Sequence, residues 1–402
     1  MIHVPEGWRL ERLGNVAQFV NGRGFKPHEW GDVGLPIIRI QNLNGSREFN
    51  YYNGEYNPKL LIKPGTLLFA WSGSKGSSFG PHFWRMPTDG LLNYHTWKIE
   101  CGDQVKVAFL YQALRQLTYT IESKAQGAAG LVHIQKGWIE DWETPMPPLE
   151  EQGAIAEILS IWDDSITKAE LLLAARTELK KGLMQQLLMG RTRFKEFVKS
   201  PKTTGTHFGP YPSDWELRRV GEFLKESRIV GSGGDVARKL SIKLYGNGIV
   251  ARRGTRSGSE HTQYYRRSSG QFIYSKLDFL NGAFAVVPDG LTGYESTLDL
   301  PAFDVSADLD VEWFLCFVCR REFYRAQVGL AAGGRKAKRV NAPEFLHMRI
   351  PVPSLGEQKR IAAVLNVCDR EIELLQKQLV ALKEQKRGLM QKLLTGEIRV
   401  KV

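Results

Sequence analysis

Cysteine is scarce in this chain, which has four among its 402 residues. Four cysteines are too few for a disulfide-stapled fold. Cys316 and Cys319 have the spacing of half a zinc site, but they lie in an apolar stretch and no second pair accompanies them. We therefore interpret both as part of a helix core, with metal or redox use as the alternative.

Long apolar runs are also absent. No run of about 18 uncharged apolar residues occurs, and Met1–Leu10 lacks the apolar segment of a signal peptide. This pattern predicts a cytoplasmic protein. The hydrophobic fraction of 42%, with 40 glycines and 18 prolines, is sufficient for packed, loop-rich domains. At roughly 100–200 residues per domain, the length argues against a single core.

Catalytic motifs are missing as well. The sequence has no Asn/Asp-Pro-Pro-aromatic tetrapeptide of an adenine methyltransferase, no phosphate-binding loop and no His-Glu-x-x-His zinc motif. His95 follows Asn93 and Tyr94 and could act as a base or contact a nucleobase, although a histidine in a strand is more often satisfied within the fold. We predict no catalytic residue, no metal and no cofactor in this chain.

The charge is strongly positive. Lys and Arg number 55 against 43 acidic residues, which gives a net charge of +12. Such a mean field favours a polyanionic partner such as nucleic acid, although many basic proteins bind no nucleic acid specifically.

A long internal repeat organises the chain. The stretch Pro145–Leu159 recurs 206 residues later as Pro351–Leu365, and the match continues without a gap to Gly190 and Gly396. The openings of the two halves also match, with a Pro-x-x-Trp motif at Pro5–Trp8 and again at 212–215. Each half is therefore expected to contain a variable domain followed by a common segment.

The common segment is predicted to be a long amphipathic helix. Apolar residues recur every three or four positions in both copies, and Arg176, Lys180 and Lys386 interrupt the stripe. We expect the two helices to bury their stripes against each other as an antiparallel coiled coil; packing of each helix on its own domain is the alternative. The residues predicted for the coiled coil and for subunit docking are Leu149, Gln152, Ile155, Leu159, Ile166, Leu183, Leu187, Leu355, Gln358, Ile361, Leu365, Ile372, Leu389 and Leu393.

Both variable domains are predicted to be rich in strands. Short alternating runs separated by Gly, Asn and Ser indicate strands at 36–43, 66–71 and 94–99 in the first half and at 272–274, 283–287 and 303–305 in the second. One helix is expected in each domain, at 105–121 and at 310–327.

Polar loops between these strands carry groups that can contact DNA. Arg and Lys pair with phosphates or guanine edges, and Asn and Gln pair with adenine edges. For any one residue, a solvated surface is the alternative interpretation. The predicted DNA-contacting residues are Arg23, Arg39, Gln41, Asn42, Ser74, Lys75 and Gln126 in the first domain, and Arg252, Arg253, Arg256, Tyr274, Lys276, Arg335, Lys336, Lys338 and Arg339 in the second.

The sequence resembles the specificity subunits of type I restriction–modification systems over essentially its whole length. The resemblance is carried by the duplicated Pro-Pro-Leu-x-Glu-Gln-x-x-Ile-Ala form at 147–156 and 353–362, the Gly-Leu-Met-Gln-x-Leu-Leu endings, and the Pro-x-x-Trp openings. Phrases such as Phe69–Ser74 and Leu91–His95 look like those of the family's target recognition domains. The second copy departs from the form at Ser354 and Gly356.

The resemblance implies an α+β fold with a pseudo-two-fold internal repeat, in which two β-rich target recognition domains are joined by two long helices in an antiparallel coiled coil. The expected boundaries are 1–148 and 212–354 for the recognition domains, 149–190 and 355–402 for the helical regions, and 191–211 for a linker.

The resemblance also implies the function and the partners. Each domain would read one half of an asymmetric bipartite site in double-stranded DNA, and the helices would set the spacer and dock the other subunits. Two methyltransferase subunits and two restriction subunits would bind the S-adenosylmethionine, ATP and Mg²⁺ that this chain does not.

Two alternatives belong to other classes. A nuclease could recruit Asp289, Glu295 and Asp304 of the second domain, although no matched lysine accompanies them. A coiled-coil adaptor that binds protein and not DNA would retain the helices but leave the basic loops unexplained.

Overall fold

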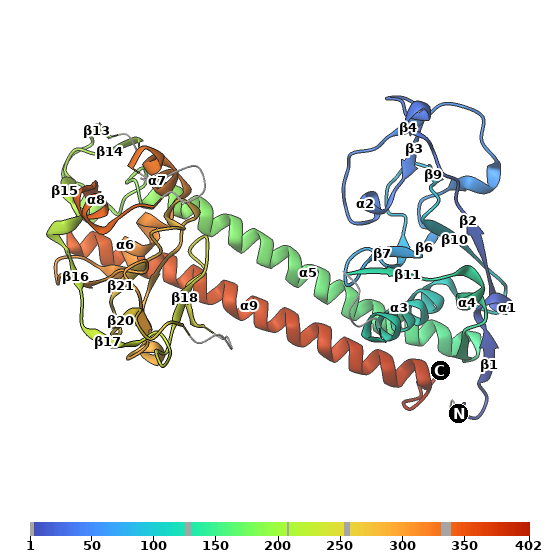
Figure 1. Ribbon diagram of the computed structural model, residues 1–402. Coiled ribbons are helices and arrows are strands. Elements are labelled where there is room, and N and C mark those ends of the chain that lie inside the picture. The colour runs from blue at the N-terminus through green and yellow to red at the C-terminus, as the bar shows by residue number, and fades with distance from the viewer. Residues whose placement is uncertain (1–3, 125–129, 207–208, 253–257, 331–338) are drawn as a thin grey trace. The chain divides into compact units, whose positions relative to one another are not determined.

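A computed structural model describes residues 4–124, 130–206, 209–252, 258–330 and 339–402 (Figure 1). The chain divides into two compact units, residues 1–171 with 377–402 and residues 172–376. Both divisions fall inside long helices, α5 (Leu149–Leu187) and α9 (Leu355–Thr395). Each unit therefore contains one β-rich domain, the beginning of one long helix and the end of the other. No helix in the described part of the chain is long and apolar enough to cross a membrane.

The first unit contains sheets with the strand orders β2-β10-β6-β8, β4-β3-β9-β5, β1-β12 and β7-β11. Its elements are β1 (Arg9–Arg12), α1 (Leu13–Val16), β2 (Ala17–Asn21), β3 (Leu35–Ile38), α2 (Ile40–Leu43), β4 (Tyr51–Tyr52), β5 (Leu61–Ile62), β6 (Leu67–Ala70), β7 (Ser72–Ser74), β8 (Gly80–Phe83), β9 (Gly90–Leu92), β10 (Thr96–Cys101), α3 (Val107–Lys124), β11 (Leu131–His133), α4 (Lys136–Glu140) and β12 (Glu143–Met146), with short 3-10 turns at Pro27–Glu29 and Pro58–Leu60.

The second unit contains sheets with the orders β16-β24-β21-β22, β17-β20-β23, β15-β25, β13-β14 and β18-β19. Its elements are β13 (Thr203–Thr206), β14 (Gly209–Pro212), β15 (Glu216–Arg219), β16 (Leu224–Ser227), β17 (Val230–Gly233), β18 (Leu240–Ile242), β19 (Ile249–Ala251), β20 (Gln263–Arg266), β21 (Phe272–Tyr274), β22 (Phe284–Val286), β23 (Glu295–Ser296), β24 (Ala302–Val305), α6 (Val311–Val318), α7 (Arg321–Ala326), α8 (Ala342–His347) and β25 (Arg349–Val352), with short 3-10 turns at Lys195–Phe197, Val220–Glu222, Phe279–Asn281, Asp289–Leu291 and Gln327–Leu330.

The internal repeat is visible in how each unit is built. In both, the strand that follows the Pro-x-x-Trp opening pairs antiparallel with the strand that precedes the long helix, β1 with β12 and β15 with β25. The four-stranded sheets β2-β10-β6-β8 and β16-β24-β21-β22 also follow one connection pattern. The two domains therefore share a set of strands, which we call the frame (β1, β2, β6, β8, β10 and β12 in the first unit; β15, β16, β21, β22, β24 and β25 in the second). The repeat had predicted only a common opening and a common helix.

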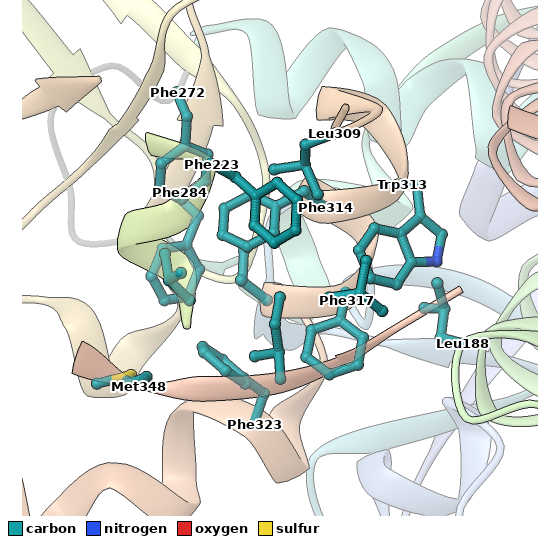
Figure 2. Close-up of a cluster of buried hydrophobic side chains, with 14 of the residues drawn as sticks. Leu188, Phe223, Phe272, Phe284, Leu309, Trp313, Phe314, Phe317, Phe323 and Met348 are labelled. Carbon is teal, nitrogen blue, oxygen red and sulfur yellow. The ribbon is translucent and has the colours of Figure 1, made fainter. Parts of the chain in front are cut away.

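Each core joins the domain to parts of both long helices. In the second unit, Leu187 and Leu188 from the end of α5 and Ile361 from the start of α9 pack with the domain's aromatic residues. Figure 2 shows part of this core, where Phe314 of α6 lies toward Phe272 of β21 and Trp313 lies on the side of Leu188. The first unit has the matching arrangement, and its helix residues are Ile155, Leu159, Met390, Leu393 and Leu394.

A glutamine at the start of each long helix ties that helix to its own domain. Gln152 donates from Nε2 to the carbonyl oxygen of Pro147 (2.9 Å), and its Oε1 accepts from the backbone N–H of Lys106 (2.8 Å), just before α3. In the second unit, Gln358 donates to a proline carbonyl (2.9 Å) and accepts from the backbone N–H of Asp310 (2.8 Å), the residue that caps α6. These bonds explain the glutamine in the repeated motif.

The preceding residue, Glu151, holds three segments of the first unit together. Its carboxylate accepts from the Trp8 indole N–H (2.9 Å) and from Nε and Nη2 of Arg399 (2.8 and 2.9 Å). Trp8 comes from the domain opening and Arg399 follows the end of α9. We call this set the helix clamp.

The second unit has the same clamp with equivalent residues. The Glu357 carboxylate accepts from the Trp215 indole N–H (3.0 Å) and from Nε and Nη2 of Arg193 (2.8 and 2.9 Å). Arg193 also pairs with Asp214 (2.7 Å). The side chain of Glu357 is 1% exposed, so this ion pair is shielded from water.

Glycines end both long helices in the left-handed region, where a side chain would strain the backbone. Gly190 has φ +63° and Gly396 has φ +72°. A Cβ at Gly190 would lie 2.4 Å from Pro212, and one at Gly396 would lie 2.3 Å from Pro5. The proline of each opening thus packs against the end of the long helix from the other half of the chain.

The helices α5 and α9 pack side by side and run antiparallel (Figure 1). In the first unit, Lys386 pairs with Asp163 (2.7 Å) and Lys383 pairs with Glu170 (2.7 Å), so residue numbers rise along one helix as they fall along the other. The antiparallel coiled coil predicted from the sequence is confirmed.

Salt bridges explain the charged residues that interrupt the apolar stripes. In the second unit, Arg176 pairs with Glu371 (3.5 Å) and Lys180 pairs with Asp369. Lys386 of the first unit occupies the position equivalent to Lys180. The interruptions are therefore pairing positions between the helices, which sequence spacing alone did not reveal.

Lys386 is the most buried of these cations, with 3% of its side chain exposed. Its Nζ donates to Gln112 Oε1 (3.2 Å), and Asp163 also accepts from Gln112 (2.9 Å) and Arg115 (2.9 Å). A cleft of about 600 Å³ opens beside this network. Burial, together with the positive charge of Arg115, lowers the pKa of Lys386 to about 8.

Several local predictions needed correction. The strand expected at 36–43 ends at Ile38, because Asn42 Oδ1 accepts from the Arg39 backbone N–H (3.0 Å) and turns the chain into α2. The helix expected at 310–327 is divided between α6 and α7, where Arg320 Nε donates to the carbonyl oxygen of Phe317 (3.1 Å). The expected linker 191–211 contains Arg193, which pairs with Glu357, and it also contains β13 and most of β14. The helix expected at 105–121 is present as α3.

We predict that Glu357→Ala lowers the free energy of unfolding of the second unit by about 3 kcal/mol, because the buried Arg193 loses its principal partner. Denaturant unfolding measures this loss. The control is Glu178→Ala, which removes the exposed Glu178–Lys181 pair on α5 and is expected to cost less than about 0.5 kcal/mol. Equal losses in the two variants would contradict a stabilising role for the clamp.

We also predict a stability change with pH that depends on Lys386. Between pH 8 and 10, folded Lys386 loses its proton while the unfolded lysine keeps it, so stability relative to Lys386→Met rises with pH. The slope approaches about 1.4 kcal/mol per pH unit. Denaturant unfolding at several pH values measures it. Lys383→Met, which removes a half-exposed lysine from the same helix, provides the control. A flat difference between wild type and Lys386→Met would refute the lowered pKa.

Candidate nucleic-acid interface

The first unit exposes some of the predicted DNA-contacting residues. Gln41 lies exposed on α2, and Ser74 and Lys75 lie exposed at the end of β7. The β7–β11 pairing and a backbone hydrogen bond from Lys75 N–H to the Gly130 carbonyl (2.8 Å) hold this loop in place. These residues can reach a ligand.

Arg23 and Arg39 are half-buried and pack on aromatic rings. The Arg23 guanidinium lies over Tyr52 (5.0 Å to the ring centroid) and pairs with Glu29. Arg39 lies over Trp30 (5.1 Å). Their charges are thus partly engaged within the domain, which fixes their positions near β4.

Two of the predicted contacts are buried, so the structure assigns them to the interior of their domains. Asn42 is 8% exposed, and its amide donates to the carbonyl oxygens of Ser46 (3.2 Å) and Glu48 (2.9 Å). Tyr274 is fully buried in β21, and its hydroxyl donates to the Val340 carbonyl (3.1 Å). The prediction that these two residues contact DNA is corrected, because neither side chain reaches the surface.

In the second unit, Arg252 is exposed beside β19, and Lys276 and Arg339 are half-buried. Arg339 lies 3.6 Å from Asp299, and the backbone N–H of Lys276 donates to the Asp299 carbonyl (2.9 Å). These bonds bring Lys276 and Arg339 together around one loop. The remaining predicted contacts lie outside the described residues: Gln126, Arg253, Arg256, Arg335, Lys336 and Lys338.

The structure brings together four aromatic and imidazole rings near Ser74 that the sequence did not group. His95 and His133 contact the Trp71 ring edge-to-face, with centroids 5.3 and 4.8 Å away. Tyr94, which is 48% exposed, packs on His95. Burial, together with nearby His133, lowers the pKa of His95. The prediction that strand packing satisfies His95 missed this surface, because β7 and β11 meet only in the folded domain.

The second unit also presents groups that the sequence did not single out. Arg238 is exposed and lies over the Tyr294 ring (4.0 Å to the centroid). Tyr245 is 60% exposed and has φ +59°, which side chains rarely adopt. Backbone bonds to Asn281 and Gly282 stabilise this turn. The sequence feature that could have indicated this turn is Tyr-Gly-Asn-Gly at 245–248.

The predicted coiled-coil residues separate into buried and exposed groups. Gln152, Ile155, Leu159, Leu187, Gln358, Ile361, Leu365 and Leu393 are buried, and Ile166, Leu183, Leu355, Ile372 and Leu389 are half-buried, whereas Leu149 is exposed. The two glutamines bond within their own units, so they are not free for another subunit. The alternative in which each helix packs on its own domain is therefore also partly correct.

The structure supports neither the nuclease nor the metal alternative. Glu295 is buried and accepts from Ser232, Asp289 accepts from the Ser269 hydroxyl, and Asp304 accepts from Gln271. The three carboxylates thus have separate partners. Within the described residues, no group of three or more His, Cys, Asp and Glu side chains could hold a metal ion.

Cys316 and Cys319 lie at the end of α6, against the core of the second unit. Burial raises the pKa of each thiol to about 12, which keeps both protonated at neutral pH. The helix-core interpretation is confirmed.

Comparison with known proteins identifies the family. The model of the type I restriction modification DNA specificity domain matches residues 5–174 and 212–384. The MjaVIII specificity subunit of Methanocaldococcus jannaschii is 26% identical over 424 residues, covering 100% of this chain and 95% of that protein. The EcoBI specificity subunit of Escherichia coli is 26% identical over 208 residues, covering 51% of this chain and 40% of that protein.

Solved structures share the fold. The S subunit of a type I restriction–modification system from M. genitalium has a TM-score of 0.56 at 15% identity, with 96% of each chain covered. A chain from a study of assembly and conformational transition in the type I system has a TM-score of 0.54 at 16% identity, covering 98% of this chain and 100% of that one. The protein belongs to the type I restriction–modification DNA specificity family, and its role is DNA recognition.

Proposed function

We propose that this chain reads a split site in double-stranded DNA, with each β-rich domain contacting one half. The observation that carries the proposal is the duplicated frame with different loops. Both units contain the helix clamp and one four-stranded sheet with the same connection pattern, whereas Ser74 and Lys75 are exposed in one unit and Arg252 and Arg238 in the other. Two equal frames with unequal surfaces suit an asymmetric bipartite target.

The basic groups on these surfaces suit a duplex. Lysine and arginine side chains neutralise phosphates and position the protein, and a smaller set of polar and aromatic groups distinguishes bases. The half-buried Arg23, Arg39 and Arg339 are held by aromatic or acidic neighbours, so their guanidinium groups are oriented before DNA arrives. The net charge of +12 adds a long-range attraction.

The long helices are proposed to set the spacer and to dock two methyltransferase subunits, in a complex that also holds two restriction subunits. Apolar residues on α5 and α9 support docking, because they remain exposed although the helices pack together; they are Ile161, Leu171, Leu172, Leu179, Val367, Leu374 and Val380. The partner subunits would bind S-adenosylmethionine, ATP and Mg²⁺ and perform the adenine-N6 chemistry. The complex would work in the cytoplasm.

We predict that this chain confers a new adenine-methylation motif. Methylome sequencing of cells that carry the methyltransferase partner, with and without the chain, measures it. A split motif that appears only with the chain is the expected result, because the chain alone supplies the sequence contacts. A stable complex that yields no motif would contradict the proposal and favour the adaptor alternative.

We further predict that exchanging residues 212–350 for the corresponding domain of another family member changes only one half of the motif. The exchange leaves the first domain, both long helices and the clamp residues Trp8, Glu151 and Arg399 of the first unit unchanged, so the first domain keeps its contacts. The same methylome assay reports both halves. A change in both halves would refute the assignment of one domain to one half-site.

A further inference from the structure

An aromatic stack leads from the core of the first domain to its surface. Phe69 is fully buried in β6, and its ring stacks on Trp97 of β10 (centroids 5.9 Å apart, 23° between planes). Trp97 stacks in turn on Trp71 with the same separation and angle. Trp71 is half-buried, so the stack ends at the surface. One face of the Trp71 ring is covered by Trp97.

The last ring of this stack is held rigidly. The Trp71 indole N–H donates to the carbonyl oxygen of Tyr94 (3.0 Å), and the Trp71 backbone N–H donates to the carbonyl oxygen of His95 (3.2 Å). The Trp71 carbonyl accepts from the backbone N–H of Ile134 (3.0 Å). Both backbone groups and the indole nitrogen are therefore engaged, and these bonds hold the two segments that carry His95 and His133 against Trp71.

The two imidazoles come from different segments. His95 lies between β9 and β10, and His133 ends β11, where it pairs with Ser72 of β7. His133 is exposed and His95 is half-buried. With Trp71 and the exposed Tyr94 they form a surface that we call the imidazole platform (Trp71, Tyr94, His95 and His133). Lys75 lies just beyond the end of β7.

We propose that the imidazole platform is a base-reading element of the first domain, in which His95 and His133 contact base edges and set which base is accepted at one position of the half-site. The inference rests on the proposed DNA-recognition function. A neutral imidazole offers one hydrogen-bond donor and one acceptor, which can match the donor and acceptor pattern of a base pair in the major groove. A fixed platform keeps these groups at defined positions, as discrimination between bases requires.

The lowered pKa of His95 supports base contact in preference to phosphate contact. An imidazole with a pKa below its ordinary value is neutral at pH 7, so it contributes little to phosphate neutralisation. Lys75, which is exposed on the adjacent loop, is the better phosphate ligand. The platform and the lysine would thus divide base reading and backbone contact between them.

Within the described residues of the second unit, the segment that follows β21 carries no such platform. Its strand β21 occupies the sheet position of β6, and the residue that follows it is Ser275, where the first unit has Trp71. Ser275 is buried and bonded to Asp278. The stack is therefore not needed to build the shared frame, which supports a role in what the first domain reads.

The test uses the full chain in complex with its methyltransferase partner. His133→Ala removes an exposed side chain and should leave folding intact; His95→Ala combined with it removes both imidazoles. The methylation motif and the affinity for duplexes changed at single positions are measured. We expect discrimination at one position of one half-site to fall by roughly 5- to 150-fold, with the other half unchanged.

The matched control is His261→Ala, which removes an exposed histidine of the second unit and should leave the first half of the motif intact. Melting temperature and partner binding check the fold, and His133→Ala alone decides the question if the double variant does not assemble. Wild-type discrimination in the variants would overturn the inference. So would an equal loss for all sequences with a weaker salt dependence, which marks a phosphate contact.

The inference and the proposed function fail in different ways. If the wild-type chain confers no motif, the DNA-recognition function itself is wrong. If the wild-type chain confers a motif that the histidine variants reproduce unchanged, only the platform assignment is wrong.

Discussion

The buried carboxylate at the start of each long helix is the constraint on which the rest of the structure depends. A carboxylate removed from water is costly unless charged and polar partners surround it. Glu151 and Glu357 each receive an indole N–H and a bidentate guanidinium. Because the arginine follows the other long helix, neither half of the chain can satisfy its own glutamate. The clamp therefore requires both repeats to be present.

This requirement separates frame from surface. The clamp, the glutamine bonds and the glycine ends occur in both units, so substitutions there affect how a domain is attached to the helices. The loops after β6 and β21 contain no clamp residue, and they differ between the units: β7 follows β6, whereas a 3-10 turn follows β21. Side chains that read DNA can change on such loops without loss of the frame, because a rigid scaffold positions them.

The sequence predicted the structure best in the segments that are repeated. Matching the two halves located both long helices, their antiparallel pairing and the motif residues, because a repeated segment of one period must fold twice in one way. The match did not explain why the motif residues are the same in both copies. Glu151 and Arg399 are far apart in sequence, and nothing in the local pattern indicates that they meet. Lys180 and Lys386, which interrupt the apolar stripes, were likewise explained only by the structure, because each pairs with an aspartate on the other helix.

The candidate site was less predictable, because residue type does not determine exposure. Asn42 and Tyr274 have suitable chemistry for DNA, yet the first closes a turn and the second fills the core. His133 and Trp71 are far apart in the sequence and share no motif. They come together only because β11 pairs with β7.

The same comparison explains how one architecture can serve an asymmetric target. Since both units attach their domain to the helices through the same bonds, each presents its sheet edge to the frame in an equivalent way. Any difference in what the two domains recognise must then arise after the shared strands end. One such difference follows β6, where Trp71 continues an aromatic stack to the surface, whereas after β21 the buried Ser275 hydroxyl donates to Asp278. The repeat thus supplies two equivalent attachments to the long helices, and each attachment carries different loops.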